Sequence, residues 1–182
     1  IFLATGYEEV EMLTVVDMLR RAKISIDMVS ITDQKEVTSS HNVTITADKT
    51  LSEVNFEEAE MLILPGGIPG TPNLLACDAL TDKIKEFAAQ GKWLSAICAA
   101  PTIYDRLGLY HGHQATCYPD FATTLEDATY VKKPVVVDDI FTTSRGAGTT
   151  IEFAAAIIER FTDKKTADTI LEKIIYNDTY DM

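Results

Sequence analysis

The chain has 182 residues, enough for one substantial hydrophobic core and too few for two, so we expect a single domain over residues 1–182. Hydrophobic residues make up 46% and charged residues 24%, proportions that are ordinary for a globular protein and argue against disorder. The formal net charge of -12 opposes binding to nucleic acids or to an anionic membrane surface, so small molecules and proteins are the expected partners.

The first fifty residues predict a strand, a helix and further strands. Residues 1–5 form an apolar run, and 8–21 have the periodicity of a helix. The expected apolar face of this helix consists of Val10, Leu13, Val16, Met18 and Leu19. A mostly buried strand is expected over 24–31, and polar turns around the alternating piece 43–46 indicate a short edge hairpin within 39–50.

The middle of the chain has the pattern of a buried parallel sheet. The apolar run Met61–Leu64 ends at Pro65-Gly66-Gly67, which is typical of a central strand entering a tight loop. A helix is expected over 74–90, with Gly91 as its C-terminal stop. Residues 93–97 form the next strand, Cys98 follows directly, and 99–107 predict a short helix with a proline in its first turn.

The last third is richer in strands and ends in helices. Short strands are expected over 115–117, 129–131, 135–137 and 141–143, followed by helices over 151–161 and 163–175. Alternating strands and helices imply a mostly parallel sheet with helices on both faces. In such sheets the ligand lies beyond the carboxyl ends of the strands, so the loops after Thr5, Leu64 and Ile97 compete for the site.

Cys98 is the first candidate for chemistry. The sequence Ala96-Ile97-Cys98-Ala99-Ala100-Pro101 places a thiol where a strand turns into a helix, between the small residues that a nucleophile elbow needs. A helix N-terminus favours a thiolate, so we expect the pKa of Cys98 to fall below the free value of about 8.5. The alternative is a cysteine that simply packs in the core; the local sequence leaves both open, and the elbow pattern favours the functional one.

Two further features would complete such a site. The backbone N–H groups of the Gly66-Gly67 turn, with that of Ala99, could form an oxyanion pocket, although two glycines also occur in ordinary turns. Glu8 and Glu9, at the start of the first helix, are expected to be solvated and to compensate the helix dipole. Glu11 lies one turn further on, where burial would raise its pKa and allow it to hold or pass a proton.

The remaining histidines and cysteines restrict the class of protein. His41, His111 and His113 lie in polar loop sequence without a third ligand at a suitable spacing, so no metal site is expected, and no dinucleotide motif indicates a cofactor. Cys77, Cys98 and Cys117 form no C-x-x-C pair, which favours a reducing compartment and a cytoplasmic protein. The chain opens without a methionine, so we expect residues before Ile1; the run 1–4 is too short for a signal or membrane segment.

Four motifs occur together and in order over nearly the whole chain. They are Gly6-Tyr7-Glu8-Glu9-Val10-Glu11, Leu64-Pro65-Gly66-Gly67, Ala96-Ile97-Cys98-Ala99-Ala100-Pro101 and Thr143-Ser144-Arg145-Gly146-Ala147-Gly148-Thr149. This combination resembles the ThiJ/PfpI superfamily, and within it the branch of the parkinsonism-associated protein deglycase and its bacterial relatives. The resemblance implies a flavodoxin-like three-layer sandwich, a homodimer, and an elbow cysteine with strained backbone.

The resemblance also assigns roles to residues. It implies that Cys98 is the reactive group, that a protonated Glu11 hydrogen-bonds its sulfur, and that Gly67 and Ala99 are backbone donors. Arg145 would lie in a loop that borders the site. Protease-like members carry a histidine directly after the cysteine, where this chain has Ala99, so peptidase activity is not expected.

A second departure concerns the base. Deglycase-like members with a Cys-His pair have the histidine before a proline on the following strand, where this chain has Tyr118. A phenol with a pKa of about 10 is a poor base at neutral pH, which weakens an enzymatic interpretation. Cys117, the neighbouring residue, raises the hypothesis of a disulfide with an oxidised Cys98, against the simpler alternative of a buried strand cysteine.

Two functions are therefore predicted as alternatives. The first is a glyoxalase/deglycase-like enzyme in which Cys98 attacks small reactive dicarbonyls or their adducts. The second is an oxidative-stress-sensing or protective protein that acts through oxidation of Cys98 without turnover and needs no base. An interaction module or inactive scaffold ranks below both, because fold alone does not fix function.

Overall fold

The computed structural model describes residues 1–176. Its two larger sheets meet where β1 (Phe2–Leu3) contacts β6 (Met61–Leu64). In the first sheet, β1 pairs in parallel with β2 (Val29–Ser30), and β2 with β5 (Lys49–Thr50). In the second, β6 pairs in parallel with β7 (Trp93–Ile97), β7 in parallel with β11 (Phe141–Ser144), and β11 antiparallel with β10 (Val135–Asp138).

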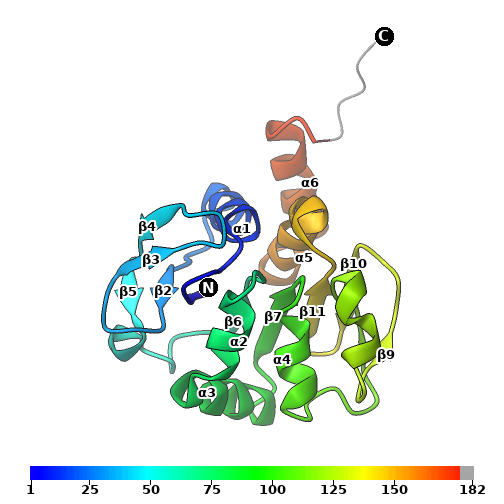
Figure 1. The fold of residues 1–182 in the computed structure, drawn as a ribbon. Helices are drawn as coiled ribbons and strands as arrows, with labels where there is room; N and C mark the ends of the chain where they lie inside the picture. The colour runs from blue at the N-terminus through cyan, green and yellow to red at the C-terminus, as the bar shows by residue number, and fades with distance from the viewer. Residues whose placement is uncertain (177–182) are drawn as a thin grey trace.

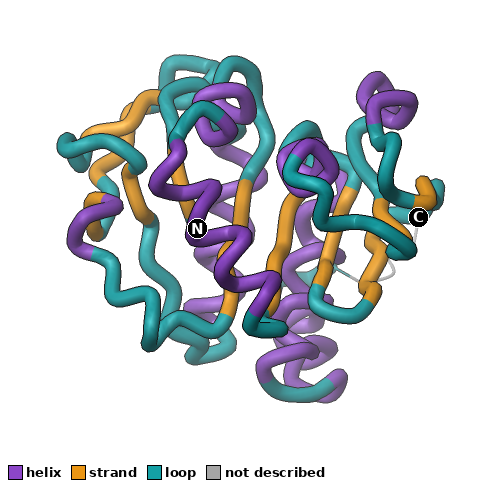
Figure 2. Tube along the Cα trace, turned by 90° about the horizontal axis from the view of Figure 1, so that it is seen from below, coloured by secondary structure: helices purple, strands orange, loops and turns teal. Residues whose placement is uncertain are grey.

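Helices cover both faces of these strands, so the predicted three-layer α/β sandwich is confirmed (Figures 1 and 2). One layer contains α1 (Glu9–Arg21), α5 (Thr150–Phe161) and α6 (Lys164–Lys173), which pack on one another. The other contains α2 (Gly70–Leu75), α3 (Asp78–Ala89) and α4 (Pro101–Arg106). Each layer buries its own apolar cluster against the sheet, because parallel strands have two apolar faces to cover.

Short strand pairs and 3-10 turns lie outside the two larger sheets. An edge hairpin is formed by β3 (Glu36–Thr38) and β4 (Thr44–Thr46), which pair antiparallel. Its second strand lies within the predicted range of 39–50, and its first strand lies before that range. A short parallel pair joins β8 (Gln114–Ala115) to β9 (Thr129–Tyr130). Three 3-10 turns complete the description: η1 (Leu51–Glu53), η2 (Pro119–Thr124) and η3 (Ala147–Thr149). Within residues 1–176, no helix combines the length and the apolar character needed to cross a bilayer.

Several predicted elements need correction. The strand expected over 115–117 is β8, which covers 114–115 and leaves Cys117 outside it, and the strand expected over 1–5 is reduced to β1. The helix expected over 74–90 is two helices, because the chain breaks at Cys77, whose carbonyl starts α3 by accepting from Leu80 and Thr81. The strand expected over 24–31 is reduced to β2, and the Asp48 carboxylate accepts the N–H of Met28 before the ladder begins. The short helix expected from residue 99 begins at Pro101, after a turn over 98–100.

The prediction of the apolar face of α1 was also partly wrong. Val10 and Leu13 are 48% and 45% exposed, whereas Met12, Val16 and Leu19 are buried against the sheet and α5. The buried residues follow the spacing of three and four along the helix, and Val10 and Leu13 lie off this stripe. The helix therefore leaves part of its apolar surface uncovered.

Candidate active site

Cys98 sits at the sharp turn between β7 and α4 that the sequence predicted. Its φ of 64° lies in the left-handed region, which is strained for a residue with a side chain. Three bonds hold the turn: Cys98 N–H donates to Ser144 O at 3.0 Å, Tyr118 N–H donates to Cys98 O at 2.8 Å, and Thr102 Oγ1 donates to Ala99 O at 2.7 Å. Neighbouring strands and loops thus impose the strained backbone.

Glu11 reaches the sulfur from α1. Its side chain is 1% exposed, and its Oε2 accepts the Gly66 N–H at 2.7 Å. Burial raises the pKa of Glu11 to about 7, against the hydrogen bonds from Gly66 and Cys98 that lower it. Oε1 is buried and has no hydrogen-bond partner within residues 1–176. The raised pKa agrees with the expectation for this carboxyl.

The pKa of Cys98 moves in the opposite direction to our expectation. Burial raises it most, and the charge of Glu11 and the hydrogen bond to its carboxylate add to the effect, while the Ala99 and Gly67 N–H groups lower it. The prediction from the helix N-terminus was wrong because sequence shows neither the burial nor the adjacent carboxylate. The two groups titrate as a pair: when Glu11 is protonated its repulsion vanishes and its O–H can donate to a thiolate.

The two predicted backbone donors both face the sulfur. The N–H groups of Gly67 and Ala99 lie close enough to the sulfur to lower the pKa of Cys98. Gly67 has a φ of 97°, and a Cβ there would lie 2.5 Å from Gly6 O and from Glu8 N, so only glycine fits. A Cβ on Gly66 would lie 2.6 Å from Cys98 Cβ. The loops after β1, β6 and β7, which competed for the site in the sequence, therefore meet at one place.

Tyr118 and Arg145 lie on the side of the elbow formed by the following loops. The Tyr118 ring is exposed and lies beside Gly146, whose added Cβ would be 3.4 Å from ring atom Cδ2. Arg145 is half-buried, and its Nε is buried without a hydrogen-bond partner in the described part of the chain. Both therefore border the elbow, while neither makes a recorded hydrogen bond to the Cys98 sulfur.

Cys117 is a buried core residue. It is 0% exposed and packs in the cluster under α3 and α4, whereas Cys98 packs against the cluster under α1 and α5. Burial raises the pKa of Cys117 to about 12, and the positive charge of Arg145 opposes that rise. These facts favour the simpler alternative over a disulfide that would resolve an oxidised Cys98.

Sequence reasoning missed a polar cluster beside the site. The side chains of Glu8 and Glu9 are only 16% and 15% exposed, so the expectation that both are solvated was wrong. His41 Nδ1 lies 3.0 Å from Glu9 Oε1, and the hydrogen bond and charge of Glu9 raise the pKa of His41. The ligand atoms of the three residues lie within 4.8 Å of one another, as in a metal site, but the Glu9–His41 ion pair already explains their proximity. His111 and His113 instead contact Asp127 and Asp138.

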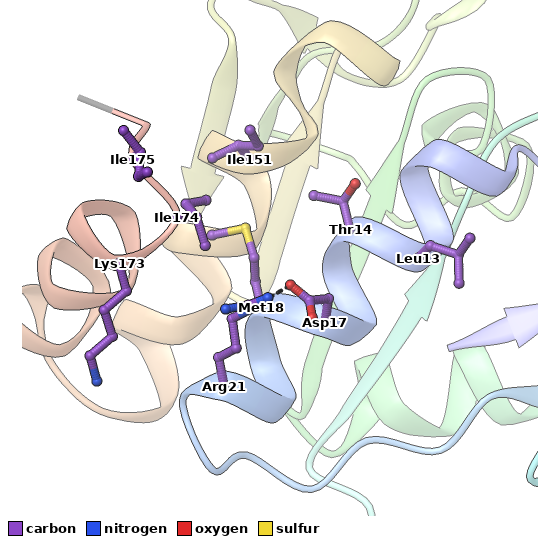
Figure 3. Close-up of a pocket in the computed structure, with 9 residues that line it drawn as sticks. All are labelled: Leu13, Thr14, Asp17, Met18, Arg21, Ile151, Lys173, Ile174 and Ile175. Atoms are coloured by element: carbon purple, nitrogen blue, oxygen red, sulfur yellow. Dashed lines mark hydrogen bonds and ion pairs between the residues drawn. The ribbon is translucent and has the colours of Figure 1, made fainter. Parts of the chain in front are cut away.

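The hollows of the surface differ in their relation to Cys98. A groove of about 550 Å³ between α1 and the end of α6 is lined by Leu13, Met18, Ile151 and Ile174, with the Asp17–Arg21 ion pair at its side (Figure 3). It shares no residue with the elbow. A smaller cavity of about 250 Å³ includes Ala99 in its wall and therefore adjoins the elbow directly.

Comparison with known proteins agrees with this geometry. Residues 1–160 match the model of the DJ-1/PfpI family. Protein DJ-1 homolog B of Arabidopsis thaliana is 35% identical over 160 residues, which are 87% of this chain and 36% of that protein; homolog A is 33% identical over 91% of this chain and 42% of its own length. The chain thus spans less than half of these two plant relatives.

Other relatives match over almost their whole length. The glutathione-independent glyoxalase DJ-1 of Schizosaccharomyces pombe is 28% identical, with 96% of both chains covered. The structure of oxidized DJ-1 from Toxoplasma gondii has a TM-score of 0.92 at 34% identity and covers 97% of each chain. These neighbours show that the sandwich described above is the flavodoxin-like fold of DJ-1 proteins, as the sequence resemblance implied.

Proposed function

The chain belongs to the DJ-1/PfpI family, and from this premise we propose that it is a cysteine-dependent glyoxalase/deglycase-like enzyme acting on small reactive dicarbonyls or their adducts. One observation carries the proposal: a buried carboxyl with a pKa of about 7 and two backbone N–H groups converge on the sulfur of a strained Cys98. The name of the S. pombe relative, a glutathione-independent glyoxalase, gives further support.

The reaction begins from the singly ionised pair, in the tautomer with Glu11 protonated and Cys98 as thiolate. The thiolate adds to the aldehyde carbon, the carbonyl electron pair moves to oxygen, and the N–H groups of Gly67 and Ala99 stabilise the alkoxide. Glu11 donates its proton to that oxygen, which gives a hemithioacetal and leaves Glu11 as a carboxylate.

Glu11 then moves the second proton. Its carboxylate removes the hydrogen of the former aldehyde carbon as a proton, and the electron pair moves toward the neighbouring ketone. The ketone oxygen takes up the proton that the hemithioacetal hydroxyl loses, and Glu11 returns its proton to the former ketone carbon, so that one carbon is oxidised by two electrons and the other reduced by two. The product is a thioester of a 2-hydroxy acid, and water hydrolyses it to the acid and the free thiol. No external oxidant is needed, and a pKa near 7 suits a group that both gives and takes protons.

The test compares methylglyoxal consumption by wild-type protein, Cys98→Ser and Cys98→Ala, with intact mass recorded to verify the reduced thiol. Glu11→Gln completes the set, because it keeps the acceptor for Gly66 and removes the proton. We expect both cysteine variants to lose turnover and Glu11→Gln to lose at least 100-fold. Unchanged turnover in Cys98→Ala, or no turnover by reduced wild type, rejects the mechanism.

Oxidation of Cys98 is the second candidate function. The same donors that would stabilise an alkoxide can hold the oxygens of a sulfinate, and the related T. gondii structure is of an oxidized protein. Under graded peroxide, Cys98 should then gain oxygen before Cys77 and Cys117. Equal or earlier oxidation of Cys77, the other half-buried thiol, would rule this function out.

We also propose a homodimer through the exposed part of α1, in the cytoplasm. Val10 and Leu13 form an uncovered apolar strip, and three free thiols suit a reducing compartment. Light scattering after size exclusion should give twice the chain mass for wild type. Leu13→Glu should give the monomer mass. The matched variant Thr14→Glu adds the same charge at the next position of α1 and tests whether an added charge alone has this effect.

A further inference from the structure

A small apolar cavity lies between α2, the elbow and η2. Its volume is about 250 Å³, and its wall includes Ile68, Thr71, Leu75, Ala99, Arg106 and Phe121. Engineered cavities of about 150 Å³ with similar apolar walls bind benzene, so this one has room for a six-membered ring. It is too small for the drug-sized ligands that fill pockets of roughly 300–1,000 Å³.

The position of the cavity connects it to the reactive sulfur. Ala99 forms part of the wall, and its N–H is one of the two backbone groups beside the sulfur that lower the pKa of Cys98. Ile68, on the same wall, directly follows the second donor, Gly67, and its side chain is 56% exposed. A carbonyl group held by the two donors would therefore have this cavity beside it, where its substituent can enter.

Two observations indicate what the cavity holds. Thr71 is 5% exposed, and its Oγ1 is buried without a hydrogen-bond partner within residues 1–176, so a buried hydroxyl in the wall lacks a polar partner. A ligand with a second oxygen next to an apolar group would supply that partner. Phe121 and the guanidinium of Arg106 also line the space, and both interact favourably with an aromatic ring.

We propose that this cavity is the substituent subsite of the Cys98 centre and that it selects 2-oxoaldehydes with an aromatic ring over those with a methyl group. The ring fills the apolar space, the ketone oxygen next to it accepts from Thr71, and the aldehyde carbon meets the sulfur. This inference rests on the proposed glyoxalase-like function, which supplies the reaction at the aldehyde.

The test uses two neighbouring threonines of η2. Thr124 lines the cavity, and Thr123 is an exposed residue outside it, so Thr124→Trp blocks the space while Thr123→Trp adds the same bulk elsewhere. For each protein, kcat/KM is measured from initial rates with phenylglyoxal and methylglyoxal. Because filling an apolar pocket discriminates by about 10- to 200-fold, wild type and Thr123→Trp should prefer phenylglyoxal at least 10-fold. Thr124→Trp should lose that preference, because it should lower kcat/KM for phenylglyoxal at least 10-fold more than kcat/KM for methylglyoxal.

A second measurement separates this inference from the proposed function. Acetophenone has the same ring and ketone and lacks the aldehyde, so it should shift the amide signals of Thr71 and Leu75 in wild type and Thr123→Trp but not in Thr124→Trp. Binding of acetophenone without turnover of either aldehyde would reject the proposed glyoxalase-like function and support the proposed subsite. Turnover of both aldehydes without preference, or equal behaviour of the two tryptophan variants, would overturn the subsite.

Discussion

The carboxyl of Glu11 should make the protein less stable as the pH rises. Burial raises its pKa from 4.5 to about 7, so the folded chain holds this proton over a range in which the unfolded chain has released it. The stability contributed by the proton is fully present below pH 4.5 and is lost as the pH rises through 7. At 1.36 kcal/mol per pKa unit, the rise from 4.5 to about 7 corresponds to about 3 kcal/mol, most of which falls between pH 5 and 8.5.

Glu11→Gln is the perturbation that isolates this contribution. The amide oxygen can still accept the Gly66 N–H bond of 2.7 Å, and the side chain no longer titrates. Urea unfolding of both proteins at pH 5 and 8.5 gives four free energies of unfolding, and all other titrating groups cancel in the difference between the proteins. The variant should therefore gain roughly 2 to 3 kcal/mol relative to wild type on going from pH 5 to 8.5.

The same measurement in the Cys98→Ala background removes the coupled thiol. Because burial is the first cause of the Glu11 shift, most of the pH-dependent difference should survive there. Parallel stability curves for wild type and Glu11→Gln would refute the reasoning, since they would show that the folded and unfolded chains release this proton at the same pH.

Further predictions follow from the elbow and its supports. The kcat/KM for methylglyoxal should fall about 10-fold per pH unit well below pH 7, as the Glu11–Cys98 pair takes up its second proton; a rate independent of pH between 5 and 7 would contradict this. Gly66→Ala should lower the turnover rate at least 100-fold, because its Cβ would lie 2.6 Å from Cys98 Cβ; steady-state kinetics of the folded variant test this. Asp105→Ala should destabilise by about 3 kcal/mol in urea, because its carboxylate accepts three backbone N–H groups from residues 126–128. Arg160→Ala should lose about 2 kcal/mol, because its guanidinium donates to two backbone carbonyls and lies 4.9 Å from the Trp93 ring centre; a change below 0.5 kcal/mol would contradict this.

The strands that carry the site were predictable, and the edge strands less so. β6 and β7 have the predicted bounds because both are mainly apolar runs closed by residues that cannot continue a strand or that start a helix. β1 and β2 are shorter than expected, because pairing depends on partners far away in the sequence that no local pattern shows.

Helix faces show the same limit. The periodicity of residues 8–21 predicts a helix, but it does not say which of two adjacent apolar stripes meets the sheet. Met12 and Val15 belong to the buried stripe, whereas Val10 and Leu13 are exposed. An apolar residue off the buried stripe indicates an uncovered surface only after the packing of α1 on α5 is known.

The positions of Cys98, Glu11, Gly67 and Ala99 came from the motifs, and the structure brings them together; the raised pKa of Glu11 was expected, but the raised pKa of Cys98 was not. A helix N-terminus lowers the pKa of a thiol by favouring its charged form, whereas burial and a neighbouring carboxylate act in the opposite direction. Burial and the neighbouring carboxylate depend on contacts between distant segments, whereas the helix N-terminus does not. The sequence therefore shows the smaller effect, that of the helix N-terminus, and does not show the burial and the neighbouring carboxylate that raise the pKa of Cys98.

The reactivity of Cys98 depends on the protonation of Glu11, because the two groups are coupled. A thiol whose ionisation is opposed by burial is a poor nucleophile unless the adjacent carboxyl keeps a proton. Because Glu11 has a pKa of about 7, the pair carries a single negative charge near neutral pH, and the proton's position decides whether the sulfur or the carboxyl bears it. In the proposed reaction, an aldehyde at the Gly67 and Ala99 donors consumes the thiolate form by bonding to the sulfur, and the negative charge moves to the carbonyl oxygen. Under this proposal reactivity depends on the occupant of the site, because the cysteine reacts with a bound carbonyl and resists ionisation when the site is empty.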